Sequence, residues 1–100
     1  MGFIYQIPDE YIDCINNSNF FLKLFYSLID IFGVELFVGH DGIYDLCSGS
    51  EGWNIAFNNT CDELGYLNLK KYRNNLKWSQ KNKFDDQIEA MLIKYYRNVI

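Results

Sequence analysis

Cysteine and histidine are the residue types in this chain that could do nucleophilic or metal chemistry. The chain has three cysteines, Cys14, Cys47 and Cys61, and one histidine, His40. A thiolate beside an imidazole is a nucleophile, and these four side chains with a carboxylate could also bind zinc. However, no basic residue flanks a cysteine to lower its pKa, and no CxxC pair is present. We therefore predict inert thiols, no catalytic residue, no cofactor and no metal site.

Charge is the most clearly non-random pattern in the sequence. The formal net charge is −4, but residues 24–69 contain no Lys or Arg. That stretch holds seven acidic residues, which are Asp30, Glu35, Asp41, Asp45, Glu51, Asp62 and Glu63. Residues 70–100 have the opposite excess, with eight Lys or Arg against three Asp or Glu. Segregation of this kind predicts a negative surface, and negative surfaces steer basic partners and raise association rates.

The predicted binding residues are the outward acids of this stretch together with aromatic anchors, because interface energy concentrates in a few aromatic side chains. The acids are Glu35, Asp41, Asp45, Glu51, Asp62 and Glu63, and the anchors are Phe37, Tyr44 and Tyr66. An acidic, aromatic-rich chain without a catalytic motif is similar in general character to bacterial immunity proteins and antitoxins. The expected function is therefore non-catalytic: inhibition of a basic partner protein, most concretely a nuclease toxin.

Two other functions are left open by the sequence. Residues 70–83, KKYRNNLKWSQKNK, interleave basic residues with Tyr72 and Trp78, a pattern that also fits a small nucleic-acid-binding regulator. Against this, an acidic domain repels phosphates over most of its surface, so nucleic acid is not the expected partner. A self-associating structural subunit would pair the acidic middle with the basic end. The basic segment could also pair with the acidic middle inside one molecule.

One hundred residues are expected to form a single domain, residues 1–100. The N-terminus has no basic region and no apolar run of signal-peptide length, and no stretch is apolar enough to span a membrane. The three cysteines are odd in number and widely spaced, which is typical of reduced thiols rather than a disulfide framework. These features predict a cytoplasmic protein without a membrane partner.

A central buried helix is predicted over residues 19–32, NFFLKLFYSLIDIF. Its polar residues Lys23, Ser27 and Asp30 fall on one narrow stripe, and every other face is apolar. Other elements should therefore cover this helix on several sides. Ser18 is expected to cap its beginning, and Gly33 to end it.

A β-hairpin is predicted over residues 34–47, VELFVGHDGIYDLC, with its turn at Gly42. An isolated hairpin is marginal in water, so it should pack on the central helix or gain a third short strand from residues 2–7. With about five helices in total, the predicted fold class is α+β and predominantly helical.

The remaining helices are predicted from caps and apolar spacing. Asp9–Ile15 should follow Pro8, and Glu51–Leu64 should begin after Ser50 and end at Gly65. Asn68 should cap a short helix, with Leu67 and Tyr72 forming a hydrophobic staple around that cap. A polar hinge at residues 79–82 should precede the last helix, which would bury residues such as Phe84, Ile88, Met91, Leu92 and Tyr95.

Overall fold

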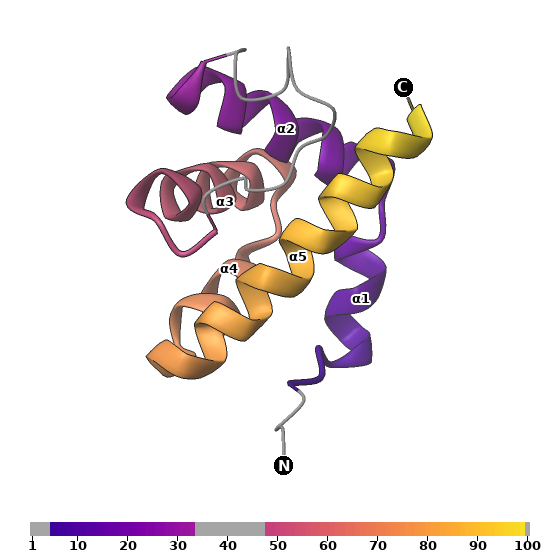
Figure 1. Cartoon of the computed structure of the whole chain (residues 1–100). Helices are drawn as coiled ribbons and strands as arrows, with labels where there is room; N and C mark the ends of the chain where they lie inside the picture. The colour runs from indigo at the N-terminus through magenta and orange to yellow at the C-terminus, as the bar shows by residue number, and fades with distance from the viewer. Residues whose placement is uncertain (1–4, 34–47, 100) are drawn as a thin grey trace.

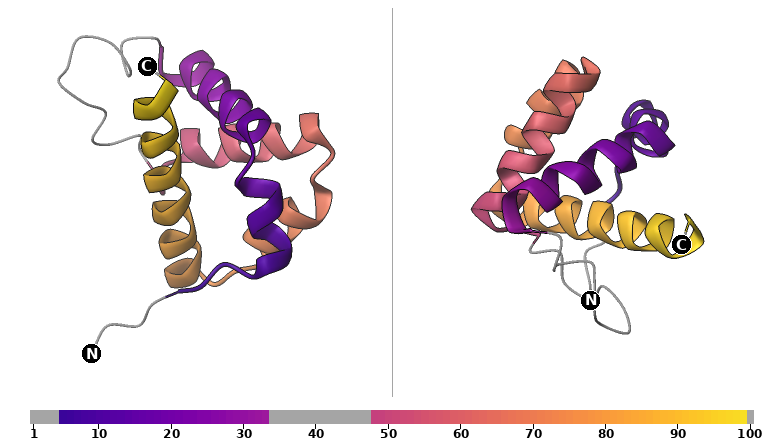
Figure 2. Two further views of the ribbon diagram at one scale, coloured as in Figure 1. Left: turned by 90° about the vertical axis from the view of Figure 1, so that its right-hand side faces the viewer. Right: turned by 90° about the horizontal axis from the view of Figure 1, so that it is seen from above.

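A computed structural model describes residues 5–33 and 48–99 of the chain, with side chains as far as Tyr96. The described residues form five α-helices (Figure 1). They are α1 (Asp9–Ile15), α2 (Ser18–Phe32), α3 (Glu51–Leu64), α4 (Leu67–Asn74) and α5 (Trp78–Val99). Helix α5 is the longest, and it crosses obliquely over the others, from α4 near its beginning to α2 near its end (Figures 1 and 2).

The predicted α+β class is wrong, because residues 5–33 and 48–99 contain helices and no strand. The alternation of apolar and polar residues that indicated a possible strand at residues 2–7 has a different cause in residues 5–7, the part that the structure describes. Tyr5 and Ile7 are buried and Gln6 is exposed, and the Tyr5 carbonyl accepts a hydrogen bond from Gln87 Nε2 of α5. An extended segment lying on a helix produces the same period of two as a strand. The predicted hairpin, residues 34–47, lies outside the described residues.

Helix α2 is central, but it is buried on one face rather than on every side. Its buried residues are Phe20, Phe21, Leu24 and Leu28. Phe20 packs against Phe57 of α3 with ring centroids 5.8 Å apart, and Phe21 packs against Tyr95 of α5 at 5.4 Å. Tyr26 on the opposite face is 57% exposed. Helices α3 and α5 therefore cover the buried face of α2, Phe25 and Ile29 pack partly against the core, and Leu22, Tyr26 and Ile31 are exposed.

The caps of α2 and α3 follow ordinary helix chemistry. Asn17, not the predicted Ser18, caps α2, because its side chain accepts a hydrogen bond from the Asn19 amide at 2.8 Å. Ser50 caps α3 as predicted, accepting from the Trp53 amide at 3.1 Å. Gly65 ends α3 as predicted, with the left-handed φ of 74° that glycine adopts without strain.

The predictions for α4 and α5 are partly wrong. Helix α4 begins one residue before the predicted cap, and Leu67 is 63% exposed, so the staple is absent. No hinge separates Trp78 from the last helix, because α5 begins at Trp78 and residues 79–82 are helical. Phe84, Ile88 and Leu92 are fully buried as predicted. Their spacing at four residues places one stripe of α5 on the core.

Candidate functional site

Four of the nine predicted binding residues lie in the described part of the chain. They are Glu51, Asp62, Glu63 and Tyr66. The other five, Glu35, Phe37, Asp41, Tyr44 and Asp45, lie outside it. The three described acids are all exposed and all belong to α3. They occupy opposite ends of this helix, Glu51 at its beginning and the other two at its end.

The acids at the end of α3 are paired within the molecule. Lys70 Nζ lies 2.8 Å from Asp62 Oδ1, and Lys23 Nζ lies 3.4 Å from Glu63 Oε2. Ion pairs this exposed add little to stability, but each places a positive charge beside a negative one. The predicted negative surface is therefore locally neutralised at this end of α3.

Tyr66 follows α3 and packs inward. It is half-buried, and its ring stacks on Phe20 of α2 with centroids 6.4 Å apart and an interplanar angle of 23°. Part of its ring area is therefore already used to hold α2 against the end of α3. Only the part of the Tyr66 ring that is still exposed could contact a partner, as the sequence-based prediction requires.

The beginning of α3 has a different electrostatic environment. Glu51 there and Asp30 near the end of α2 are exposed, and neither forms an ion pair within the described part of the chain. The two helices run in opposite directions, since Lys23 reaches Glu63 while the Phe32 ring packs on Gly52. The end of α2 and the beginning of α3 therefore lie together. We call Asp30 and Glu51 the negative end of the α2–α3 pair.

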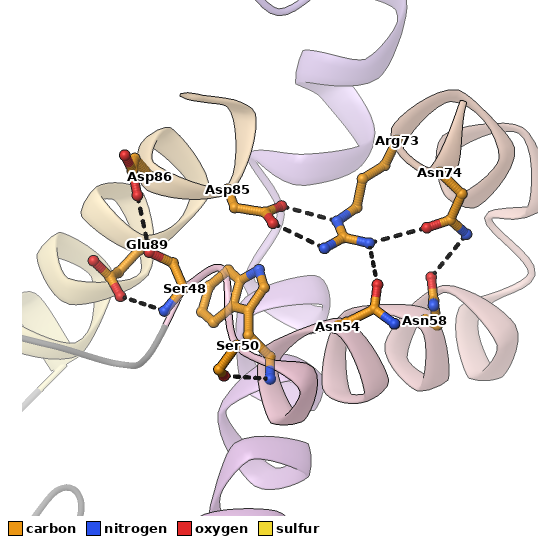
Figure 3. Close-up of polar contacts among 10 residues, drawn as sticks. Ser48, Ser50, Asn54, Asn58, Arg73, Asn74, Asp85, Asp86 and Glu89 are labelled. Carbon is orange, nitrogen blue, oxygen red and sulfur yellow. Dashed lines mark hydrogen bonds and ion pairs between the residues drawn. The ribbon is translucent and has the colours of Figure 1, made fainter. Parts of the chain in front are cut away.

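One polar face of α3 contacts α4. Asn54, Asn58 and Asp62 repeat at every fourth residue of α3 and form contacts with α4, although Asp62 was expected to face outward. Arg73 Nη1 donates to Asn54 Oδ1 at 2.7 Å, and Asn74 Nδ2 donates to Asn58 Oδ1 at 3.1 Å (Figure 3). With the Lys70–Asp62 pair, these contacts form a polar seam along both helices.

A buried ion pair joins α4 to α5 beside this seam. Arg73 donates from Nε to Asp85 Oδ1 and from Nη2 to Asp85 Oδ2, both at 2.8 Å (Figure 3). The two side chains are only 2% and 1% exposed, and the guanidinium carbon lies 5.0 Å from the centre of the Phe57 ring. Arg73 was counted as a surface cation in the sequence. Its spacing of four residues from the buried Leu69 is the signal that would have placed it inward.

The thiol chemistry of Cys61 follows from its position. Cys61 is fully buried, and burial first, then the nearby Asp62 charge, raise its pKa to about 12. It is therefore a protonated thiol at neutral pH and a poor nucleophile. Cys47 and His40, the other members of the considered nucleophile and zinc sites, lie outside the described residues. Within the described ranges, no three acidic, cysteine or histidine side chains are grouped as metal ligands.

Comparisons of the chain with protein-family models, with curated proteins and with solved structures found no match. No helix in residues 5–33 or 48–99 combines the length and apolar character needed to cross a bilayer.

Proposed function

We propose that this protein is a non-catalytic inhibitor that binds a basic partner protein in the cytoplasm. The negative end, Asp30 and Glu51, is the part of the described surface on which we base this proposal. The supporting observation is the contrast between the two ends of the α2–α3 pair: Lys23 and Lys70 neutralise one end, and no described cation pairs with the other. In sequence, residues 34–47 lie between Asp30 and Glu51 and contribute Glu35, Asp41 and Asp45.

A nuclease toxin is the most concrete partner for such a surface. Enzymes that bind nucleic acid need positive charge to attract phosphates. A negative protein surface is complementary to that charge, and it can cover the substrate cleft by the same electrostatic attraction. This proposal therefore describes an immunity protein or antitoxin. Self-association is a weaker alternative, since two cations of the basic end, Lys70 and Arg73, already have carboxylate partners within the molecule.

The proposal is tested by isolating the partner and measuring its activity. The tagged protein would be expressed in the cells that encode it, and co-purifying proteins would be identified by mass spectrometry. We expect a basic protein whose purified form cleaves RNA or DNA, and whose cleavage stops when this chain is added at an equimolar ratio. A partner that is acidic, or a basic nuclease whose activity is unchanged by excess inhibitor, would overturn the proposal.

A further inference from the structure

Trp78 is the most exposed of the large hydrophobic side chains in the described part of the chain. It is 80% exposed at the first position of α5, while Trp53, the other tryptophan, is fully buried. Tryptophan is largely buried on average in folded proteins, so an indole this open to solvent is unusual. Exposed aromatic rings of this size are characteristic of binding surfaces.

Two lysines lie beside Trp78. Lys77 precedes it directly, and Lys81 follows it by three residues, which places Lys81 next to Trp78 on the surface of α5. Neither lysine forms an ion pair with an acidic residue among those that the structure describes. The indole therefore lies within a small positive area of an otherwise acidic protein.

An open cleft is formed by α1, α4 and the residues that precede Trp78. Its volume is about 420 Å³, and it is lined by Tyr11, Asn68, Lys71, Tyr72, Asn75 and Leu76. The rings of Tyr11 and Tyr72 stack with centroids 4.6 Å apart. Leu76 precedes Trp78 by only two residues, a chain length that spans at most about 7 Å. The backbone at Trp78 is therefore close to one lining residue of the cleft, and we call Lys71, Lys77, Trp78, Lys81 and this cleft the Trp78 surface.

We propose that the Trp78 surface binds single-stranded nucleic acid. An exposed aromatic face can stack on any unpaired base, and lysine ammonium groups attract the phosphates of the same strand. The side-chain amides of Asn68 and Asn75 can donate to and accept from the edge of a base that enters the cleft. Charge complementarity therefore favours a polyanion with aromatic units over an apolar peptide.

This surface differs from the nucleic-acid-binding segment that the sequence indicated, which was residues 70–83 as a whole. Lys70 and Arg73 are not available, because they pair with Asp62 and Asp85. The Trp78 surface uses three of the other lysines, Lys71, Lys77 and Lys81, and the negative end contains none of its residues. The inference is therefore independent of the proposed inhibitor function, and either can fail alone.

The first test uses 12-nucleotide oligothymidylate and oligouridylate, with a duplex of the same length, at low salt. We expect both single strands to quench the fluorescence of the exposed indole, and the duplex to quench it far less. Trp78→Ala should weaken binding of the single strands, measured by fluorescence anisotropy of a labelled strand, about 5- to 150-fold. Tyr26→Ala, which removes an exposed aromatic ring from α2, is the matched control and should leave binding unchanged.

The second test measures the salt dependence of the same binding. Three lysine–phosphate contacts predict a slope of about −2 for log K against log salt, so a fourfold rise in salt weakens binding about 20-fold. Each of Lys71→Gln, Lys77→Gln and Lys81→Gln should reduce the slope by about 0.7. Lys94→Gln, at an exposed position far along α5, should leave the slope unchanged.

Three results would overturn the inference. The first is the absence of measurable binding of either single strand at low salt. The second is binding that survives Trp78→Ala at full strength, which would place the strand elsewhere on the protein. The third is a duplex that binds as tightly as the single strands, because paired and stacked bases cannot use the indole face.

Discussion

Arg73 and Asp85 form a bidentate ion pair between α4 and α5, with both N···O distances at 2.8 Å. Nearly all of both side chains is hidden from solvent, so each charge depends on the other for its solvation. Arg73 also donates to Asn54 of α3, which makes one guanidinium the meeting point of three helices. The arrangement of α3, α4 and α5 therefore depends on a polar contact as well as on the apolar core.

Removing one partner of this pair should destabilise the protein strongly. Asp85→Ala leaves the Arg73 charge buried without its carboxylate, which typically costs about 3–5 kcal/mol. The double variant Arg73→Met with Asp85→Leu removes both charges and should recover most of that loss. Urea unfolding followed by circular dichroism measures both. A cost below about 1 kcal/mol for Asp85→Ala would show that water reaches the pair.

Helix α2 provides a direct comparison between its buried and exposed faces. Leu28→Ala removes a fully buried side chain and should cost about 2–5 kcal/mol. Tyr26→Ala, on the exposed face, should change stability by no more than about 0.5 kcal/mol. Similar urea midpoints for the two variants would mean that the solvent face of α2 is assigned wrongly.

Gly52 packs against the Phe32 ring where α2 meets the beginning of α3. A Cβ atom at this position would overlap the far end of that ring, so Gly52→Ala must displace the partly exposed Phe32 side chain and should fail to gain the stability of about 1 kcal/mol that the higher helix propensity of alanine would otherwise give. Adding Phe32→Ala makes room for the methyl group. In a double-mutant cycle, Gly52→Ala should therefore be more favourable in the Phe32→Ala background. An equal effect in both backgrounds would contradict the contact.

Burial of Cys61 makes stability depend on alkaline pH. Its pKa is raised from 9.0 to about 12 on folding, so between these values the unfolded chain loses the thiol proton while the folded protein retains it. The unfolded state binds fewer protons in this window, and the free energy of unfolding therefore falls as the pH rises above 9. Cys61→Ala removes this contribution. Urea titrations at about pH 7.5 and 9.5 should show a smaller decrease for the variant than for the wild type.

Local signals predicted much of the helical structure. Ser50 and Gly65 bound α3 because a side-chain oxygen caps the first amides and glycine accepts a left-handed turn, and both effects depend on adjacent residues only. The possible strand at residues 2–7 rested on a similar local pattern. The alternating burial of Tyr5 and Ile7 reflects packing against α5, which no short window of sequence contains.

The candidate site was less predictable than the fold, because a sequence does not show which charged residues will form ion pairs with one another in the folded chain. Asp62 and Glu63 have the same acidic character as Glu51, and only the folded chain brings Lys70 and Lys23 to them. Asp30 was counted in the acidic stretch and on the polar stripe of the central helix, but it was not among the predicted binding residues. The antiparallel packing of α2 and α3 places it at the same end of the pair as Glu51.

The association rate with the isolated partner is the most direct test of the inhibitor proposal. Asp30→Lys with Glu51→Lys reverses the negative end, and Glu10→Lys with Asp13→Lys makes the same charge change at exposed positions of α1. We predict that the first variant associates about tenfold or more slowly at low salt, that the second stays close to wild type, and that the difference shrinks as salt screens the charges. Equal slowing by both variants, or no slowing by the first, would contradict the proposal that the negative end binds the partner.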